Sequence, residues 1–208
     1  MGDDSMQENK KNRVIVLSRE YGSGGSQIGR LLAEQLGVPY YDKTFVNKAV
    51  EDSGLSTKFL EEEEQKFINS LLFSLATGEY RYGGDKFMSN QVFIAQSNAI
   101  KEVAQQGPCV IVGRCADYIL KDECDVFSVF IHADLSWRVE RAVREYGLKA
   151  RIAEQKVKEK DRSRARHYEY YTDRSWGEHS NYHMSINSGH FTPEQCVELI
   201  RRALAFTE

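Results

Sequence analysis

A cluster of glycines behind the first apolar stretch constrains the fold of this chain more than any other feature. Residues 14–17 form a short run of valine, isoleucine and leucine, and residues 21–26 contain Gly22, Gly24 and Gly25. A short apolar run bounded by turn residues is typical of a buried strand. Closely spaced glycines let several backbone N–H groups converge on one anion, next to the positive end of a helix. The pattern favours a phosphate-binding loop over its alternative, a plain strand–helix turn.

A helix is predicted directly after this loop. Its apolar positions recur at offsets of three, four and eight residues, namely Ile28, Leu31, Leu32 and Leu36. Such spacing gives one apolar face that can pack against a sheet. Gly37 follows at the position where a left-handed C-cap costs glycine little. We therefore expect a strand, a loop and a helix to open the fold.

Two later apolar runs predict further strands. Residues 109–112 and 126–131 are rich in β-branched and aromatic residues and are bounded by turn-forming residues. Short buried strands that alternate with helices imply a parallel sheet covered on both faces. The predicted fold class is α/β, with three layers in which helices cover both faces of the sheet.

Two more helices are predicted from spacing and capping signals. A helix over residues 135–146 would bury one apolar face, which consists of Leu135, Val139, Val143 and Tyr146. The last helix begins at Thr192, which is a plausible N-cap. Pro193 suits the first helical position, and Gln195 completes a capping box.

The length of 208 residues allows one domain with a full core. We expect a disordered leader over residues 1–12 and a single domain over residues 13–206. Residues 45–106 contain helical stretches with little strand character, so we interpret them as a helical insertion that caps one end of the sheet. Residues 147–180 are polar and rich in arginine, which is typical of a lid over phosphates. The alternative for that segment is a solvated pair of charged helices.

The composition argues against several classes of function. The formal net charge of −3 gives no reason to expect a nucleic-acid or anionic-membrane partner. No stretch approaches the roughly 20 apolar residues of a membrane span, and the N-terminus lacks the apolar segment of a secretory signal. The four cysteines show no paired spacing, which fits reduced thiols in the cytoplasm better than disulfides or structural zinc. The sequence leaves the oligomeric state open.

The glycine cluster departs from the Walker A pattern G-x-x-x-x-G-K-[ST] at the position of its lysine. With Gly24 aligned to the last motif glycine, Gly25 stands at the lysine position and Ser26 at the Ser/Thr position. Arg19 then replaces the first glycine. The motif lysine normally contacts the β- and γ-phosphates during phosphoryl transfer. We therefore expect either weak nucleotide binding or another cation in its place, with Arg19 a better candidate than Arg30.

Further stretches repeat motifs of one kinase family in the same order. Residues 112–114 (Val-Gly-Arg) follow a buried strand as a Gly-Arg-Asp segment does there, with Cys115 in place of the aspartate. Residues 130–141 match a strand followed by an arginine-bearing helix. Residues 161–165 (Asp-Arg-Ser-Arg-Ala) are close to the lid motif Asp-Arg-Asn-Arg-Ala. Over residues 13–206 the chain thus resembles the cytidylate kinase-like branch of the P-loop nucleoside monophosphate kinases.

The resemblance implies ATP-dependent phosphoryl transfer to a small acceptor, such as the nucleoside monophosphate CMP, with Mg²⁺ as the metal. Arginine suits this chemistry because its planar guanidinium binds phosphate oxygens in pairs. The predicted catalytic residues are Arg19, Arg138, Arg141 and Arg162. The predicted ATP-binding residues are Gly22, Ser23, Gly24, Gly25, Ser26 and Gln27, with Ser26 as the Mg²⁺ contact. The predicted acceptor-binding residues are Asp42, Lys48, Arg114, Asp161 and Arg164.

Two other functions are compatible with the sequence. One is a nucleotide-binding regulatory protein with a degenerate, inactive kinase fold, for which Gly25 at the lysine position is the best evidence. The other is a scaffold that binds phosphoanions without a nucleotide partner. ATP turnover would argue against the first, and a nucleotide-induced rise in melting temperature would argue against the second.

Overall fold

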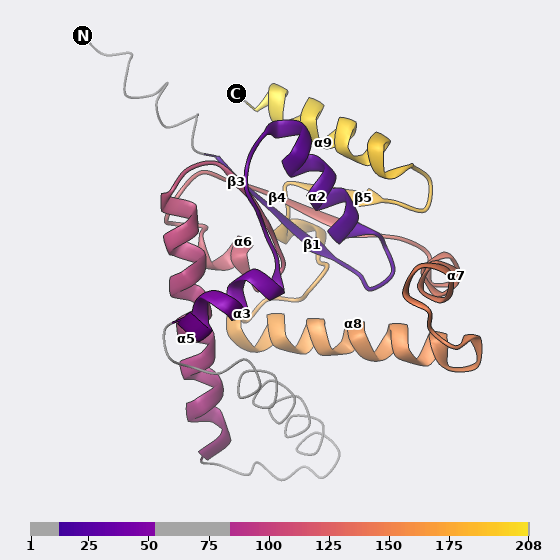
Figure 1. The fold of residues 1–208 in the computed structure, drawn as a ribbon, viewed down its shortest axis with the longest axis horizontal. Helices are drawn as coiled ribbons and strands as arrows, with labels where there is room; N and C mark the ends of the chain where they lie inside the picture. The colour runs from indigo at the N-terminus through magenta and orange to yellow at the C-terminus, as the bar shows by residue number, and fades with distance from the viewer. Residues whose placement is uncertain (1–12, 53–83, 208) are drawn as a thin grey trace.

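The computed structural model describes residues 13–52 and 84–207, which build a sheet flanked by helices (Figure 1). Within these residues the sheet has five strands in the order β2-β3-β1-β4-β5. They are β1 (Val14–Arg19), β2 (Tyr40–Tyr41), β3 (Cys109–Val112), β4 (Val126–His132) and β5 (Met184–Asn187). Every pairing is parallel, and Val14 is in register with Cys109 on one side and Val126 on the other. The predicted α/β fold is confirmed.

The central strand β1 is buried on both faces and leads directly into the glycines. Val14, Val16 and Leu17 have a relative exposure of 0%, as expected for a parallel strand covered on both sides. The strand predicted over residues 14–17 continues for two more residues and ends at Arg19. An arginine therefore stands at the carboxyl end of the central strand, where open α/β sheets bind their ligands.

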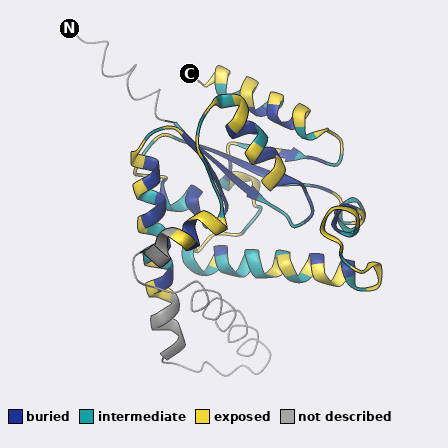
Figure 2. Cartoon of the chain, viewed as in Figure 1, coloured by how far each residue is buried: buried dark blue, intermediate teal, exposed yellow. Residues whose placement is uncertain are grey.

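One face of the sheet is covered by α2 (Gly25–Leu36) and α9 (Pro193–Phe206), which also contact each other (Figure 1). Ile28 and Leu32 of α2 share a buried apolar cluster with Ile200 of α9. Figure 2 shows the outward sides of both helices as exposed and the strands beneath them as buried. The apolar face predicted for the helix after the glycines is the face that packs on the sheet.

Both helices have the predicted ends. Gly37 closes α2 with a φ of 66°, in the left-handed region. Thr192 accepts a hydrogen bond from the N–H of Gln195 through Oγ1 at 3.2 Å, and its own N–H donates to Gln195 Oε1 at 2.9 Å. Both helix ends could be predicted from neighbouring residues in the sequence, without knowledge of the tertiary structure.

The opposite face of the sheet is covered by α3 (Lys43–Asp52), α5 (Gly84–Gln105) and α6 (Ala116–Ile119). Ile100 of α5 and Leu120, which follows α6, are fully buried in a second apolar cluster. The described parts of the predicted insertion, residues 45–52 and 84–106, are largely helical. The rest of it, residues 53–83, and the predicted leader, residues 1–12, lie outside the described residues.

Two helices, α7 (Leu135–Tyr146) and α8 (Ala150–Thr172), follow β4 and pack on each other. In Figure 1 α8 runs as a long helix along the lower side of the domain, within the segment predicted as a lid. Residues 179–181 form a short 3₁₀ helix before β5. Among the described helices, none has the length and apolar character that crossing a bilayer requires.

The buried face of α7 differs from the predicted one. Its buried residues are Arg138, Arg141 and Ala142. The predicted apolar face is only half-buried at Leu135, Val139 and Val143, and Tyr146 is exposed. The helix predicted over residues 135–146 is confirmed, but its most buried side chains include two arginines and none of the four predicted apolar residues. The helix turns its arginines inward because carboxylates, carbonyls and an amide oxygen are available there to compensate them, as the next subsection describes.

Candidate functional site

The connection from β1 to α2, residues 20–24, is called the glycine loop below and has the backbone geometry of an anion-binding turn. Gly22 and Gly24 adopt left-handed conformations, with φ of 86° and 81°. The turn is closed by hydrogen bonds from the N–H and Oγ of Ser23 to the carbonyl of Glu20, at 3.3 and 2.9 Å. Gly24 caps α2 without a side chain, and the first turn of α2 contains no acidic residue. The first-turn N–H groups can therefore meet an anion at the positive end of the helix.

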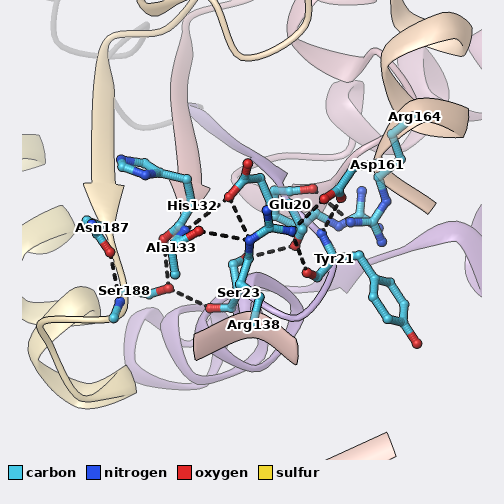
Figure 3. A network of polar contacts seen from close by, with 12 residues as sticks. Glu20, Tyr21, Ser23, His132, Ala133, Arg138, Asp161, Arg164, Asn187 and Ser188 are labelled. Atoms are coloured by element: carbon cyan, nitrogen blue, oxygen red, sulfur yellow. Dashed lines mark hydrogen bonds and ion pairs between the residues drawn. The ribbon is translucent and has the colours of Figure 1, made fainter. Parts of the chain in front are cut away.

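Arg138 of α7 binds the glycine loop and lies in a network in which two carboxylates compensate its charge (Figure 3). Its guanidinium lies 3.1 Å from the carboxylate of Glu20 and 2.5 Å from that of Asp161. It also donates to the carbonyl of Ala133 at 2.8 Å and to that of Tyr21 at 3.0 Å. Asp161 in turn accepts from the N–H of Tyr21 at 2.6 Å, and Glu20 from the N–H of Ala133 at 3.1 Å. One buried cation thus faces two carboxylates, and all five residues fix the loop.

Two of the predicted site residues belong to this network, where they contact other parts of the protein. Arg138, predicted as catalytic, and Asp161, predicted as acceptor-binding, contact each other and the backbone of the loop. Glu20 was missed, although it lies inside the loop that the sequence singles out. Ser188 was missed as well, and its hydroxyl lies 2.7 Å from the carbonyl of Ser23 and 3.0 Å from that of His132. No motif marks Ser188, because it reaches the loop only through the order of the strands.

Arg141 of α7 lies at the start of α2. Its Nη2 donates to Oε1 of Gln27 at 2.8 Å, and its Nη1 donates to the hydroxyl of Tyr146 at 2.7 Å. A Cβ added to Gly24 would lie 3.5 Å from the Cζ and Nε of Arg141. Arg141 therefore places a buried cation against the last glycine of the loop and holds it there through neutral groups. The predicted ATP-binding residues Gly24 and Gln27 and the predicted catalytic residue Arg141 are brought together.

Arg19 leaves the end of β1 in another direction, toward the loop after β3. A Cβ added to Gly113 would lie 2.0 Å from Nη1 of Arg19, and one added to Gly25 would lie 2.5 Å from Cβ of Arg19. The carbonyl of Arg19 accepts a hydrogen bond from Nη1 of Arg164 at 2.8 Å. Burial first, and then the nearby Arg164, lower the pKa of Arg19 to about 9. Its Nε is buried and has no hydrogen-bond partner among the described residues.

A cavity of about 280 Å³ opens at this point, between the ends of β1 and β3 and the helices α3, α5 and α8. We call it the cationic cavity, because its lining includes the side chains of Arg19, Lys43, Arg114, Lys160 and Arg164. Among the described residues that line it, there is no aspartate or glutamate. Its aromatic lining residues are Tyr21, Phe93, Tyr168, Tyr171 and Trp176. The cavity thus combines an excess of positive charge with flat apolar surfaces, which suits an anion that carries a ring.

The floor of the cationic cavity is formed by a strained turn. Arg114 and Cys115 both adopt left-handed conformations, with φ of 61° and 56°, which is unusual for residues other than glycine and is common at functional sites. Nη2 of Arg114 lies 3.5 Å from Oδ1 of Asn47, which also accepts from Nε2 of Gln96 at 3.3 Å. Burial raises the pKa of the Cys115 thiol, so that thiol is not an activated nucleophile.

Aromatic residues form one wall of the cavity. The rings of Phe93 and Tyr171 stack with centroids 3.8 Å apart and an interplanar angle of 7°. Tyr168 donates its hydroxyl proton to Oδ2 of the buried Asp117 at 2.6 Å, and burial raises the pKa of both groups. Trp176 packs edge-on against Phe130 at 5.4 Å. The aromatic segment near the end of α8 therefore packs within the domain and also contributes to the cavity.

Four further predicted site residues, Asp42, Lys48, Arg162 and Ser26, lie outside the lining of the cavity. Asp42 accepts hydrogen bonds from the N–H groups of Thr44 and Phe45 at 2.9 and 3.3 Å and forms an ion pair with Arg30 at 3.3 Å. It therefore caps α3. Lys48 and Arg162 are exposed, on α3 and α8. Ser26 is exposed in the first turn of α2.

The described residues contain no cluster of three or more histidine, cysteine or carboxylate side chains that could hold a metal ion. The hydroxyl of Ser26, in the first turn of a helix with a glycine cap, is the type of group that holds Mg²⁺ together with nucleotide phosphates in P-loop proteins. The residues present fit Mg²⁺ that arrives with a nucleotide.

The model of the cytidylate kinase-like family matches residues 14–190 of this chain. The chain belongs to this family. The match spans the glycine loop, the cationic cavity and both lid-side helices, α7 and α8. No protein with a curated description matches the chain.

Solved structures of kinases have the same fold as this family member. An uncharacterized protein from Eubacterium ventriosum is 24% identical, with a TM-score of 0.71 over 92% of this chain and 98% of that one. Shikimate kinase from Acinetobacter baumannii in complex with shikimate is 14% identical, with a TM-score of 0.52 over 94% of each chain. A gluconokinase from Sinorhizobium meliloti is 16% identical, with a TM-score of 0.52 over 95% of this chain and 94% of that one. At these identities the likeness shows the P-loop kinase fold.

Proposed function

We propose that this protein transfers a phosphoryl group from ATP–Mg²⁺ to a small anionic acceptor, and that the acceptor is a nucleoside monophosphate such as CMP. The observation that carries the proposal is the cationic cavity beside the glycine loop. Tyr21 lines the cavity and also belongs to the loop, so the two sites share a wall. Phosphoryl transfer requires such a neighbourhood, because the attacking and transferred groups must meet in line.

The donor half of the site is built on the glycine loop. Its N–H groups and the start of α2 would hold the phosphates of ATP, and Arg141 would place a guanidinium beside them. Ser26 is the proposed contact for Mg²⁺, which when bound neutralises charge on the β- and γ-phosphates. No side-chain nucleophile is needed, since the acceptor itself attacks and the protein positions and neutralises.

The acceptor half is the cationic cavity. Its volume of about 280 Å³ is of the order of small-ligand pockets, and its guanidinium and ammonium groups would bind a phosphate. The stacked Phe93 and Tyr171 offer a flat wall to a base. Membership of the cytidylate kinase-like family supports a monophosphate acceptor, and the fold shared with shikimate kinase and gluconokinase supports small-molecule phosphorylation more generally. ATP as donor and four free cysteines favour a cytoplasmic reaction.

One observation favours a second candidate, a regulatory protein that binds nucleotides without turnover. Gly25 stands at the lysine position of the loop, and a Cβ there would lie 2.5 Å from Cβ of Arg19, so that no side chain fits at that position without movement. Phosphoryl transfer would then depend on Arg141 and Mg²⁺ for neutralisation.

The decisive experiment measures ADP formation with ATP, Mg²⁺ and a panel of acceptors. The panel contains CMP, UMP, AMP and GMP, together with shikimate and gluconate. We expect turnover with at least one monophosphate well above the rate with water alone. Turnover with only a carboxylate would overturn the acceptor class. Binding of ATP with no turnover on any acceptor would favour the regulatory alternative.

A further inference from the structure

Arg19 and Gly25 are an exchanged pair. Relative to the Walker A pattern, a long cation stands where a glycine is usual, and a glycine stands where the lysine is usual. The two positions share space, since a Cβ on Gly25 would lie 2.5 Å from Cβ and 2.9 Å from Cγ of Arg19. The side chain of Arg19 therefore depends on the glycine at position 25, because a lysine at that position would collide with it.

The guanidinium of Arg19 is directed into the cationic cavity. Its Nη1 lies so close to Gly113 that a Cβ there would be 2.0 Å away, and Gly113 and Arg19 both line the cavity. The cation beside Gly24, on the glycine loop, is instead Arg141, whose Cζ would lie 3.5 Å from a Cβ at that position. Arg19 therefore lies in the cavity beside the glycine loop, whereas Arg141 lies against Gly24 of the loop.

The described groups around Arg19 carry too little negative charge to compensate its guanidinium. Arg164 and Arg114 both lower the pKa of Arg19, and the effects of Tyr40 and Asp42, which raise it, do not offset burial. Its Nε is buried without a hydrogen-bond partner among the described residues. An uncompensated guanidinium is costly in a protein interior unless a ligand supplies the missing anion. The unmet donor marks a position at which a ligand anion would be stabilised.

We propose that Arg19 binds the anionic group of the acceptor and is not a substitute for the missing lysine on the donor phosphates. This inference deepens the proposed function and rests on the assignment of the cavity to the acceptor. It also narrows the substrate class, because Arg19, Arg114 and Arg164 together suit a phosphate dianion better than a single carboxylate. The exchange of Arg19 and Gly25 moves a cation from the donor side of the loop to the acceptor side.

The first test measures the binding of each nucleotide separately by calorimetry, without turnover. The probes are ATP–Mg²⁺ alone and each of CMP, UMP, AMP and GMP alone, and the tightest monophosphate is used for the variants. We expect Arg19→Met to weaken monophosphate binding by about 10- to 100-fold, the scale of a hydrogen bond to a charged group, and to leave ATP–Mg²⁺ binding within about threefold. Arg144→Met, at an exposed arginine of α7, is the matched control. A loss of ATP binding with unchanged monophosphate binding would overturn the proposal.

The second test restores the Walker A arrangement with the double variant Arg19→Gly/Gly25→Lys. Removal of the Arg19 side chain frees the space that a lysine at position 25 needs. We expect the double variant to bind ATP–Mg²⁺ at least as tightly as wild type and to keep the weakened monophosphate binding of Arg19→Met. Recovery of wild-type monophosphate binding would instead assign Arg19 to the donor. If Arg19→Met does not fold by circular dichroism, Arg19→Lys carries the first test, with a smaller expected loss because an ammonium lacks the planar fork.

Failure of this inference can be distinguished from failure of the proposed function. A protein that forms no ADP with any acceptor but loses monophosphate binding on Arg19→Met refutes turnover and supports the role of Arg19. A protein that forms ADP but whose monophosphate affinity is unchanged by Arg19→Met supports turnover and refutes the role of Arg19. Binding of shikimate or gluconate without binding of any monophosphate overturns the phosphate-dianion class.

Discussion

Two arginines flank the glycine loop, and their electrostatic surroundings are opposite. Arg138 is buried between the carboxylates of Glu20 and Asp161 and donates to two backbone carbonyls. Arg19 lies in a cavity whose described lining has other cations and no carboxylate. A buried charge is tolerated where the protein compensates it, as at Arg138. At Arg19 no carboxylate among the described lining residues supplies this compensation, which is the condition expected of a ligand-binding group.

The helix α8 contributes to both surroundings. Asp161 completes the network around Arg138, and Arg164, less than one turn later, donates to the carbonyl of Arg19 and lines the cavity. Burial lowers the pKa of Arg164 as well. The same helix therefore holds the loop in place with a carboxylate and adds positive charge to the cationic cavity with an arginine. This division explains why the lid motif contains both kinds of residue.

The largest expected effect comes from removing Arg138, whose charge is compensated by the carboxylates of Glu20 and Asp161. Arg138→Met leaves the carboxylates of Glu20 and Asp161 without their shared cation in a largely buried place. We expect the free energy of unfolding to fall by about 3–5 kcal/mol, the usual cost of removing one partner of a buried ion pair. Urea denaturation at pH 7 measures this, with the exposed Arg144→Met as control, for which we expect a change within about 0.5 kcal/mol. Equal stability of Arg138→Met and wild type would show that the network does not stabilise the fold.

A second experiment removes a different cation from the uncompensated side. Arg114→Met should weaken the binding of the monophosphate acceptor by about 1.5–3 kcal/mol, because a hydrogen bond to a charged group is lost. ATP–Mg²⁺ binding should change much less, since Arg114 lies in the floor of the cationic cavity. Calorimetry with each nucleotide measures both, and Arg202→Met on the outer side of α9 serves as the control. A larger loss for ATP than for the monophosphate would reverse the assignment of the two halves.

The strands and helix caps of this fold could be predicted because their signals are local. The apolar run before the glycines, the C-cap at Gly37 and the capping box at Thr192 each lie within a few residues of the element they specify. The buried face of α7 could not be predicted in the same way. Arg138 is stable inside only because Glu20 and Asp161 lie beside it, and those residues are far away in the chain.

The residues of the candidate site also differ in whether a local sequence motif predicts them. Motifs identified the glycine loop, Arg114 and Arg164, since each belongs to a short pattern that the family shares. Residues that line the cavity from α3 and α8, such as Lys43 and Lys160, belong to no motif and are brought in by packing. The Walker A comparison also predicts Arg19 as a substitute for the lysine, and only the structure shows that its side chain lies beside Gly113 in the cationic cavity.

A third experiment tests the cost of the uncompensated charge directly. Arg19→Met should stabilise the ligand-free protein at pH 7 by about 1–2 kcal/mol, since a guanidinium whose buried Nε has no hydrogen-bond partner among the described residues is replaced by an apolar chain. The pKa of Arg19 in the folded protein is about 9, below its ordinary value of 12.5, so the cost is fully present below pH 9. It declines as the pH rises through 9, and the advantage of the variant should shrink accordingly. Melting temperatures of both proteins at pH 7 and pH 10 measure this, and a variant less stable than wild type at pH 7 contradicts it.

The smallest expected effect is at Ser188, which supports the compensated side of the loop from the end of β5. Its hydroxyl lies 2.7 Å from the carbonyl of Ser23 and 3.0 Å from that of His132, and its side chain is buried. Ser188→Ala removes the donor and leaves the carbonyl of Ser23 without this contact, which should cost about 1 kcal/mol of stability. Because Ser23 lies in the turn whose N–H groups would meet the donor phosphates, the variant should also bind ATP–Mg²⁺ more weakly, by about threefold, while monophosphate binding stays at the wild-type value. Ser185→Ala, at an exposed serine of β5, is the matched control for stability and binding. Weaker monophosphate binding in Ser188→Ala, with ATP binding intact, would mean that the loop and the cavity do not divide donor and acceptor between them.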